Sequence, residues 1–407
     1  MATPLSNHLR ATSAGSPYTV ERISSVHAIA ELRTDWNRLS DVAPAPNVFT
    51  TYEWYQAWIG RLIADSGPGS LEPWLLVVRQ GETIAGIAPM VRRVAIRGGI
   101  RVRKIEFLTH HADYNELVVG CDVPALTAAV LDTLARSTHE WDLLDLMDLR
   151  DDAAQANLLE RTAVHAGLYR RAFAEPDGCL YMPIDAPWAE ARSRKHLRFA
   201  RRASLAFEQR AHEGFRARVI DRPHIEADLL QRIIAVEAQK HVAGQLSRPV
   251  VGRYREVFQA LVDTLGPRGG IAIVVVEKDE RLIAWRWLYR CGSKLWDYLT
   301  AYDHAFSELS PGTILLCESI DYGFAQGVQE FDFLRGMDMY KQRWTSTFRS
   351  NRRMILWSRR WKSRLAAWAL LRQHARHAAA DKTSNHAAQV AGQKRAIVLD
   401  QKGNHLA

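Results

Sequence analysis

The apolar and polar positions between residues 271 and 344 follow one ordered pattern. Two apolar runs flank a short acidic turn, and a third, aromatic-rich run follows a second tight turn. Ser-Pro-Gly-Thr at 310–313 then opens a helical stretch, and Phe-Asp-Phe-Leu at 331–334 is typical of a closing strand. Proline fits the first turn of a helix because its missing N–H is not needed there. We therefore expect an antiparallel meander, a helix that begins at Pro311, and a final strand.

The first half of the chain repeats this pattern. Residues 76–86 and 274–284 each contain an apolar run, a polar turn and a second apolar run, which is the signature of a hairpin. A strand that begins with lysine (Lys104 or Lys294) comes next, and then a helix that begins with proline (Pro124 or Pro311). Each helix is followed by a Glu-aromatic-Asp-apolar strand. Four shared motifs in the same order indicate a duplication.

These motifs predict an α/β (α+β) chain with two tandem domains, each a mixed, mostly antiparallel sheet flanked by helices. We place the first domain at 18–179 and the second at 180–350, after a disordered leader at 1–17. The segment 351–407 has apolar residues three or four positions apart with arginines between them. It predicts a basic amphipathic helix followed by a disordered tail. The apolar stripe of that helix is Met354, Trp357, Trp361, Leu365, Trp368 and Leu371.

The net charge of +9 is concentrated in this last segment. Residues 351–407 contain 12 Lys and Arg but only two acidic residues, so the rest of the chain is nearly neutral. This distribution argues against a protein that binds DNA over its whole surface. The four cysteines form no Cys-x-x-Cys pair, which favours neither a zinc site nor a secreted disulfide framework and indicates the cytoplasm.

Two basic segments have alternative interpretations. The stretch 192–214 has a helix-like apolar stripe among arginines, and it is either a solvated helix face or an anion-facing helix that lines a substrate groove, with Arg198 as a substrate-binding residue. The helix after Arg353 either lies on an anionic membrane surface, docks a partner such as a polysaccharide synthase, or folds back over the second domain. The first alternative places the protein at the periphery of the inner membrane face.

The helix start at 310–313 is a candidate site for a phosphorylated carrier. Unpaired amides at a helix N-terminus carry about half a positive charge and bind anions. Ser310, Gly312 and Thr313 are the predicted anchors. Lys341 is a further candidate for contact with the carrier phosphates, and so is Arg343, although both also suit a plain surface role.

The order of these motifs resembles the BioF-like acetyltransferases of the GNAT superfamily, which are associated with cellulose and other exopolysaccharide biosynthesis and are relatives of the Fem-type peptidyltransferases. In the second half the matching motifs are Leu-Ile-Ala at 282–284, Ala-Tyr-Asp at 301–303, Leu-Ser-Pro-Gly at 309–312, Phe-Asp-Phe-Leu-Arg-Gly at 331–336 and Tyr-Lys-Gln-Arg-Trp at 340–344. In the first half they include Gly-Ile-Ala-Pro at 86–89 and Asp-Tyr at 113–114. The basic helix at 194–202 also matches. The resemblance covers about residues 46–344 and implies two tandem GNAT folds.

The resemblance implies acetyl-CoA or another acyl-CoA as donor, and a small molecule or glycan precursor as acceptor. One feature of the superfamily is missing. Its pyrophosphate loop, Arg/Gln-x-x-Gly-x-Gly/Ala, is replaced at 304–313 by a segment with a single glycine. Fewer glycines leave fewer backbone amides that can approach a phosphate closely.

Acyl transfer to an amine needs a group that takes a proton, because an amine has a pKa of about 10.4. Asp303, Asp332 and Glu318 are the candidate acceptors, and Tyr302 and Tyr340 are candidate acids. For Asp332 a structural role is an equal alternative, because Asp142 occupies the matching position of the first repeat. His111, Asp113 and Tyr114 are predicted to line a substrate groove. We predict no metal site, because the adjacent His110 and His111 point to opposite faces of a strand.

Three functions are consistent with these observations. The leading hypothesis is an acyl-CoA-dependent N- or O-acyltransferase that acts on an exopolysaccharide, cellulose or cell-envelope component or its precursor. The second is a Fem-like transferase that takes an amino acid from charged tRNA; no other nucleic-acid partner is expected. The third is a non-catalytic accessory protein of a polysaccharide synthase.

Overall fold

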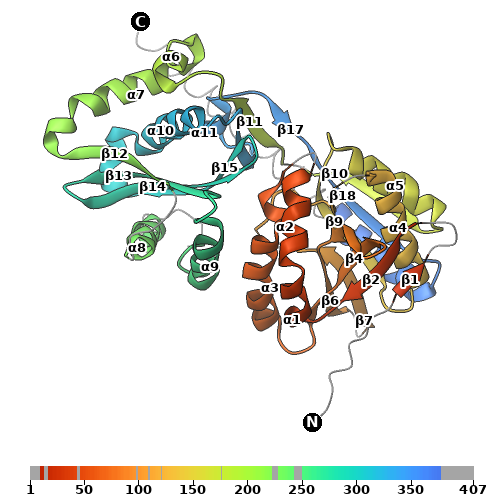
Figure 1. Cartoon of the computed structure of the whole chain (residues 1–407). Coiled ribbons are helices and arrows are strands. Elements are labelled where there is room, and N and C mark those ends of the chain that lie inside the picture. Colours follow the sequence, from red (N-terminus) through yellow and green to blue (C-terminus); the bar gives the residue numbers. More distant parts are fainter. Residues whose placement is uncertain are drawn as a thin grey trace, which may run out of the picture.

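The predicted meander is present in the second half of the chain. In this computed structural model it consists of β13 (Ile271–Lys278), β14 (Arg281–Cys291) and β15 (Lys294–Tyr302), followed by α10 (Pro311–Ala325) and β16 (Glu330–Arg335). The structure describes residues 10–12, 17–43, 46–97, 100–108, 111–120, 122–175, 177–221, 228–242 and 250–376. Within these residues the chain forms two α/β units that lie side by side (Figure 1). The predicted fold class is therefore confirmed.

The second unit is built on one seven-stranded sheet in the order β12-β13-β14-β15-β16-β11-β17. The outer strands are β12 (Phe215–Asp221), β11 (Cys179–Pro183) and β17 (Phe348–Arg349). One face of the sheet is covered by α10 and the other by α8 and α9 (Figure 1). The helices of this unit, besides α10, are α6 (Trp188–Ala191), α7 (Arg198–Gln209), α8 (Leu229–Val242), α9 (Arg255–Leu265) and α11 (Met339–Gln342), with short 3-10 turns η2 (Lys195–Leu197), η3 (Ala211–Glu213) and η4 (His304–Leu309).

The first unit divides the same layout between two sheets, ordered β1-β2-β4-β5-β8 and β10-β18-β9-β7-β6-β3. Pro89 separates β5 from β6 and cannot donate to a ladder, so the chain passes there from one sheet to the other. The strands are β1 (Arg10–Thr12), β2 (Thr19–Ile23), β3 (Leu71–Pro73), β4 (Leu75–Gln80), β5 (Thr83–Ala88), β6 (Met90–Arg97), β7 (Ile100–Phe107), β8 (Val118–Val119), β9 (Leu143–Arg150), β10 (Tyr169–Ala174) and β18 (Asn351–Trp357). The helices are α1 (Val26–Glu31), α2 (Arg33–Val42), η1 (Val48–Thr50), α3 (Tyr52–Ser66), α4 (Val123–Arg136) and α5 (Ala154–His165).

The two units share details of the backbone. Both hairpins have an irregularity at the same place, between Val78 and Arg79 and between Val276 and Glu277. Both units contain one parallel pair of strands, β7 with β9 and β15 with β16, and each pair is joined at three positions only. Both following helices begin after a left-handed residue and carry proline in the first turn. The duplication predicted from the sequence therefore extends to the turns and irregularities.

The first unit is completed by a strand from a segment that follows the second unit in the sequence. Strand β18 lies between β9 and β10 of the first unit, and β11 lies between β16 and β17 of the second. The chain thus crosses twice between the units, as the blue strands and β11 show in Figure 1. The prediction of a helix from Met354 onward is corrected here, because Met354, Ile355 and Leu356 are each 0% exposed in a strand. Consecutive apolar residues suit a strand that is buried on both faces.

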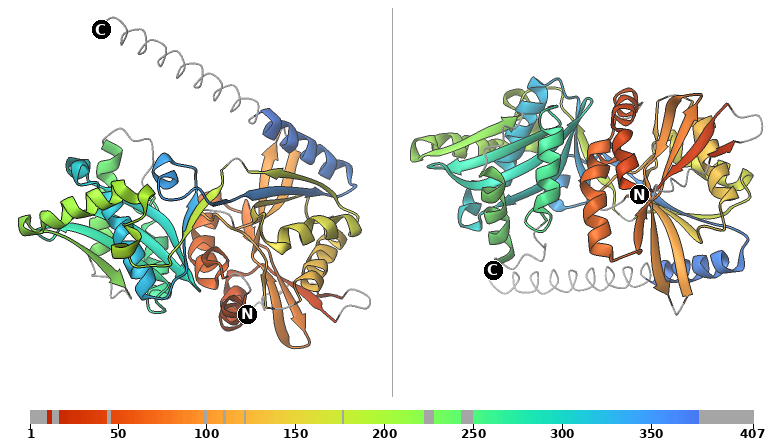
Figure 2. Two further views of the ribbon diagram at one scale, coloured as in Figure 1. Left: turned by 90° about the horizontal axis from the view of Figure 1, so that it is seen from above. Right: turned by 60° about the horizontal axis from the view of Figure 1, so that its bottom comes forward.

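The helix that follows spans residues 361–376 and packs on the first unit (Figure 2). Its inner face carries Ala366 and Ala367, which contact Val102, Leu143 and Ile355. It therefore does not fold back over the second unit. Within the described residues, no helix has the length and hydropathy needed to cross a bilayer.

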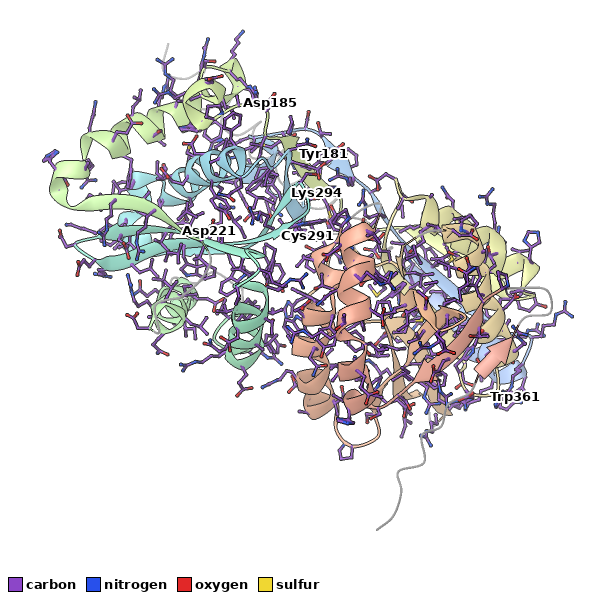
Figure 3. All side chains as sticks on the ribbon, viewed as in Figure 1. Tyr181, Asp185, Asp221, Cys291, Lys294 and Trp361 are labelled. Carbon is purple, nitrogen blue, oxygen red and sulfur yellow. The ribbon has the colours of Figure 1, made fainter. Side chains whose placement is uncertain are left out.

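The two units meet through an aromatic cluster. Trp54 of α3 lies edge-on to Tyr289 and Tyr298 of the second sheet, with ring centroids 5.8 and 5.6 Å apart. Phe49 contacts Trp296 in the same way at 5.9 Å. Cys291 and Lys294 lie at this junction (Figure 3). Large buried aromatic side chains make the contact between the units part of a single core.

Glu277 is expected to make the second unit sensitive to acid. Its side chain is 1% exposed and accepts hydrogen bonds from Arg216, Arg218 and Arg232. Burial alone would raise its pKa, but these arginines lower it to about 2, from an ordinary value of 4.5. The folded-state pKa is depressed, so the stabilisation is present above pH 4.5 and is lost as the pH falls from 4.5 toward 2.

Glu277→Gln should therefore lower the free energy of unfolding at pH 7 by about 3 kcal/mol, because three arginines lose their common carboxylate. The difference from the parent should shrink when urea unfolding is repeated at pH 3. Glu308→Gln is the matched control, since Glu308 is 62% exposed and lies 3.9 Å from Arg210. Equal stability of Glu277→Gln and the parent at pH 7 would contradict the prediction.

Candidate functional site

The start of α10 is open. Ser310 precedes the helix in the left-handed region, with φ 54°, and its side chain caps no amide. In the first unit the corresponding residue, Asp122, accepts a hydrogen bond from the Ala125 amide at 3.3 Å. The amide of Gly312 lies in the first turn, where no earlier helical carbonyl is available to it. A Cβ atom added to Gly312 would meet nothing within 4 Å. The exposed helix start therefore faces free space.

That space is a pocket of about 400 Å³, which we call the α10 pocket. Five of the residues predicted for the site line it together: Tyr302, Ser310, Gly312, Thr313 and Tyr340. The pocket is also lined by residues that were not predicted from the sequence, namely Phe199, Arg286, Thr300, Ser307, Pro311, Leu316 and Trp344. Arg343 also lines the pocket, in place of the predicted Lys341. Residues from α7, β14, β15, α10 and α11 thus converge on one cavity.

Arg286 gives the pocket a buried positive charge. It is 1% exposed, forms an ion pair with Asp297, and donates to the Gly312 carbonyl at 3.3 Å. Its Nε atom is buried without a hydrogen-bond acceptor among the described residues. A guanidinium that lines the pocket beside the open N-terminus of a helix is suited to bind an anion. The signal in the sequence is a single arginine inside the apolar run of β14, between Trp285 and Trp287.

One strand that lines the pocket, β15, has an edge that is not paired with β16 along part of its length. Strands β15 and β16 are paired only from Lys294 to Trp296 of β15, so the two parallel strands separate beyond that point. Thr300 and Tyr302 lie on the separated part of β15 and line the pocket. An unpaired strand edge presents backbone N–H and C=O groups that can hydrogen-bond an extended ligand. The pocket therefore combines an anion site with a backbone edge.

A tyrosine and an arginine, Tyr340 and Arg343, line the α10 pocket from the segment after β16. Tyr340 is 40% exposed, and burial of its hydroxyl, together with the nearby Asp297 carboxylate, raises its pKa. The Tyr340 phenol therefore stays protonated at neutral pH. The Arg343 guanidinium lies 3.8 Å from the centroid of the Phe199 ring, a cation–π contact that holds the cation beside the pocket.

The other predicted residues lie outside the α10 pocket, and the first three are Asp303, Lys341 and Arg198. Asp303 caps η4 by accepting from the Ala305 amide at 3.0 Å, and it pairs with Arg281 at 2.6 Å. Lys341 is 5% exposed and donates to the carbonyl of Arg335 at 2.5 Å, at the end of β16. Arg198 is exposed on α7 and does not line the pocket, whereas its neighbour Phe199 does.

Asp332 and Tyr114 lie instead at the junction between the units. Asp332 accepts hydrogen bonds from the Tyr114 hydroxyl at 2.9 Å, the Leu334 amide at 2.8 Å and Arg349 at 3.0 Å. Burial raises the pKa of Asp332 to about 6, against the lowering effect of these donors. Its hydrogen-bonding capacity is used to join β16, β17 and the first unit. This arrangement supports the structural alternative for Asp332.

The strand pairing shows that Asp332 and Asp142 do not occupy matching positions in the two units. Lys294 is paired with Glu330, but the corresponding Lys104 is paired with Leu143. Two residues further along, Asp332 therefore corresponds to Asp145. The Asp145 carboxylate binds Arg353 of β18 at 2.7 Å, so each unit uses a buried aspartate to hold an arginine near its closing strand.

His111 and Asp113 also lie at the junction. The His111 ring lies 5.1 Å from the Trp58 ring and 5.2 Å from the Tyr254 ring. The Asp113 carboxylate accepts from the Arg335 amide at 3.1 Å, and burial raises its pKa. His110 lies outside the described residues. Among those that are described, no group of three or more His, Cys, Asp or Glu is arranged to hold a metal ion.

Comparisons with known proteins agree with this geometry. Residues 191–342 match a family described as acetyltransferase (GNAT) domain, a range that includes Arg286, Gly312 and Tyr340. The second unit therefore contains a GNAT acyltransferase domain, and the protein is an acyltransferase. No curated protein matches the sequence as a relative.

Two solved structures resemble the whole two-unit fold. FemX is similar over 78% of this chain and 95% of its own, with a TM-score of 0.55 and 12% identity. A conserved protein of unknown function from Bacteroides thetaiotaomicron VPI-5482 is similar over 81% of this chain and 97% of its own, with a TM-score of 0.54 and 11% identity. At such low identity these similarities establish the fold alone.

Proposed function

We propose that the acyl donor is acetyl-CoA or another acyl-CoA, and that it binds in the α10 pocket. The buried Arg286, which lines the pocket beside the open start of α10, is the observation that carries this proposal. A coenzyme A phosphate fits a site made of a guanidinium, a free helix amide and the exposed Arg343. When bound, the coenzyme supplies the activated acyl group as a thioester.

The residues of the pocket then position the acyl group and supply a proton to the leaving group. The open edge of β15 beyond Trp296 provides backbone donors for the acyl carbonyl oxygen, whose negative charge grows during transfer. Tyr340 keeps its proton at neutral pH and donates it to the leaving thiolate as the carbon–sulfur bond breaks, while the proton of the acceptor nitrogen or oxygen passes to water, from which Tyr340 is reprotonated. Asp303 and Asp332 are bound to other partners and Glu318 does not line the pocket, so we assign this proton transfer to Tyr340, with Tyr302 as the second hydroxyl of the pocket.

The acceptor in this proposal is an amine or hydroxyl group of an exopolysaccharide, cellulose or cell-envelope component, or of its precursor. The motif order at 282–344 supports this class, because it resembles the BioF-like acetyltransferases. A cytoplasmic site of action is consistent with the three free cysteines of the described residues, Cys179, Cys291 and Cys317.

A second candidate is a Fem-like transfer of an amino acid from charged tRNA. It is favoured by the similarity to FemX over 95% of that chain and by the single glycine of the 304–313 segment. The two candidates differ in the donor that the α10 pocket accepts, so donor binding separates them.

Gly312→Trp is expected to abolish acyl-CoA binding without unfolding the protein. The added side chain enters the pocket, where a Cβ meets no other atom, and the backbone at Gly312 does not have a positive φ. Acetyl-CoA should raise the melting temperature of the parent and leave that of the variant unchanged, with affinity reduced at least about tenfold. Gly60→Trp is the matched control, because Gly60 is an exposed glycine of α3 with equally free space.

The same titration tests the alternative. Acetyl-CoA, a longer acyl-CoA and aminoacyl-tRNA are offered in turn to the parent and to Gly312→Trp. Binding of aminoacyl-tRNA alone, with no acyl-CoA binding at millimolar concentration, overturns the proposal in favour of the Fem-like reaction. Acyl-CoA binding that Gly312→Trp leaves intact overturns the assignment of the pocket.

A further inference from the structure

The helix at 361–376 has two apolar faces. Its inner face is covered by the first unit: Ala366 and Ala367 are buried against the sheet, and Lys362 lies 3.6 Å from Asp142. The outer face carries Trp361, Leu365 and Trp368, which are 71%, 40% and 56% exposed. Their spacing of four and three residues places them in one row along the helix. The helix is therefore held rigidly with an apolar row turned to solvent.

This exposure is exceptional for the chain. Of its 13 tryptophans, Trp361 and Trp368 are the two that are more than a third exposed, and the rest are inside the cores or partly covered. Figure 3 shows Trp361 standing at the surface of the first unit, away from Lys294 and the junction. Large apolar side chains exposed on a well-packed helix indicate a surface that contacts a membrane or another protein.

The charged residues around this apolar row indicate which kind of partner fits it. Residues 351–376 contain no Asp or Glu. Arg359, Arg364 and Arg376 are exposed and form no ion pair with any described residue, and Arg372 lies over the Trp368 ring at 5.1 Å. Tryptophan prefers the headgroup level of a bilayer, and arginine is attracted to anionic lipid headgroups. A row of Trp and Leu with free arginines along it combines both preferences.

A second copy of the chain fits this face poorly. A symmetric pair would bring arginine against arginine, because no acidic residue of the segment can complement them. The three apolar side chains also expose only on the order of 400 Å², whereas a stable interface buries about 800 Å² per partner. A membrane surface needs no matching partner residues.

We infer that the outer face of the 361–376 helix is a docking surface for an anionic lipid membrane, with Trp361, Leu365 and Trp368 in the headgroup layer and Arg359, Arg364 and Arg376 on the lipid phosphates. The helix lies in the plane of the membrane surface and fixes the orientation of the first unit, against which its inner face is packed.

Vesicle co-sedimentation of the full-length chain tests this inference. The vesicles contain phosphatidylcholine alone or an equal mixture of phosphatidylcholine and phosphatidylglycerol. The parent should bind the mixed vesicles and not the neutral ones, and added salt should release it. Trp361→Ser/Trp368→Ser should weaken binding by about tenfold or more. Arg364→Gln/Arg376→Gln should weaken it and reduce the dependence on salt.

The variants and the control change only one or two exposed side chains and keep the rest of the chain. All variants retain residues 377–407, so any contribution of that segment is constant. Phe324→Ser removes an exposed aromatic side chain (45% exposed) from α10 of the second unit and should bind like the parent. Unchanged melting temperatures show that the exposed substitutions leave the fold intact.

Several outcomes overturn the inference. Equal sedimentation of the parent and Trp361→Ser/Trp368→Ser with mixed vesicles excludes the tryptophan row as the docking surface. Equal binding to neutral and mixed vesicles excludes anionic lipid as the partner. Self-association in sedimentation velocity that the tryptophan variant abolishes identifies a second copy as the occupant. RNA binding that is lost in this variant, while vesicle binding persists, identifies nucleic acid.

Discussion

Truncation after Ser350 is expected to unfold the first unit, although every residue removed lies beyond the second unit in sequence. The deletion removes β18, which is paired with β9 on one side and β10 on the other. It also removes Met354, Ile355 and Leu356, each fully buried. Burial of one such side chain contributes about 1.5–3 kcal/mol, so the three together approach the net stability of a domain, about 5–15 kcal/mol.

The matched control is truncation after residue 376, which keeps β18 and the helix at 361–376. Circular dichroism and calorimetry should show parent-like cooperative unfolding for this control, and aggregation or a lost transition for the chain that ends at Ser350. A chain ending at Ser350 that unfolds like the parent would contradict the place of β18 in the sheet of the first unit. Any test of the last segment by deletion must therefore keep residues 351–376.

Arg286→Met is expected to lower both stability and donor binding, and a second substitution should separate the two effects. The single change leaves the Asp297 carboxylate buried without its partner, since both side chains are at most 3% exposed in their ion pair. Loss of one member of a buried pair costs about 3–5 kcal/mol. In Arg286→Met/Asp297→Leu the stranded charge is gone, so the free energy of unfolding should recover most of that loss.

Acyl-CoA binding should not recover in the double variant, because the guanidinium that faces the α10 pocket is still absent. Urea unfolding measures the first effect and calorimetric titration with acetyl-CoA the second. Parent-like affinity in the stable double variant would show that Arg286 acts only through the fold. Arg290→Met is a control for loss of an arginine from the same strand, since Arg290 binds the Gly269 carbonyl and Gln326 instead.

The residues that line the α10 pocket show which part of a site sequence patterns can predict. Ser310, Gly312 and Thr313 were selected from a helix-start signal, which depends only on neighbouring residues, and they line the pocket together. Arg286 was not selected, because its role depends on Asp297 and on Gly312, which reach it only through sheet pairing and the packing of α10. Asp303 has the carboxylate that a proton acceptor needs, but that carboxylate is bound to the Ala305 amide and to Arg281.

The sequence by itself determined the two repeated α/β units, the meander before α10 and the proline-started helix, because hairpin turns, strand periodicity and helix starts are encoded within about ten residues. Only the tertiary structure decided that β18 returns to the sheet of the first unit, that Asp332 is bound at the junction, and that the tryptophan row of the last helix faces outward. These features depend on contacts between residues far apart in the chain. A run such as Met354-Ile355-Leu356 suits a buried strand in either unit, and only the open place between β9 and β10 selects one.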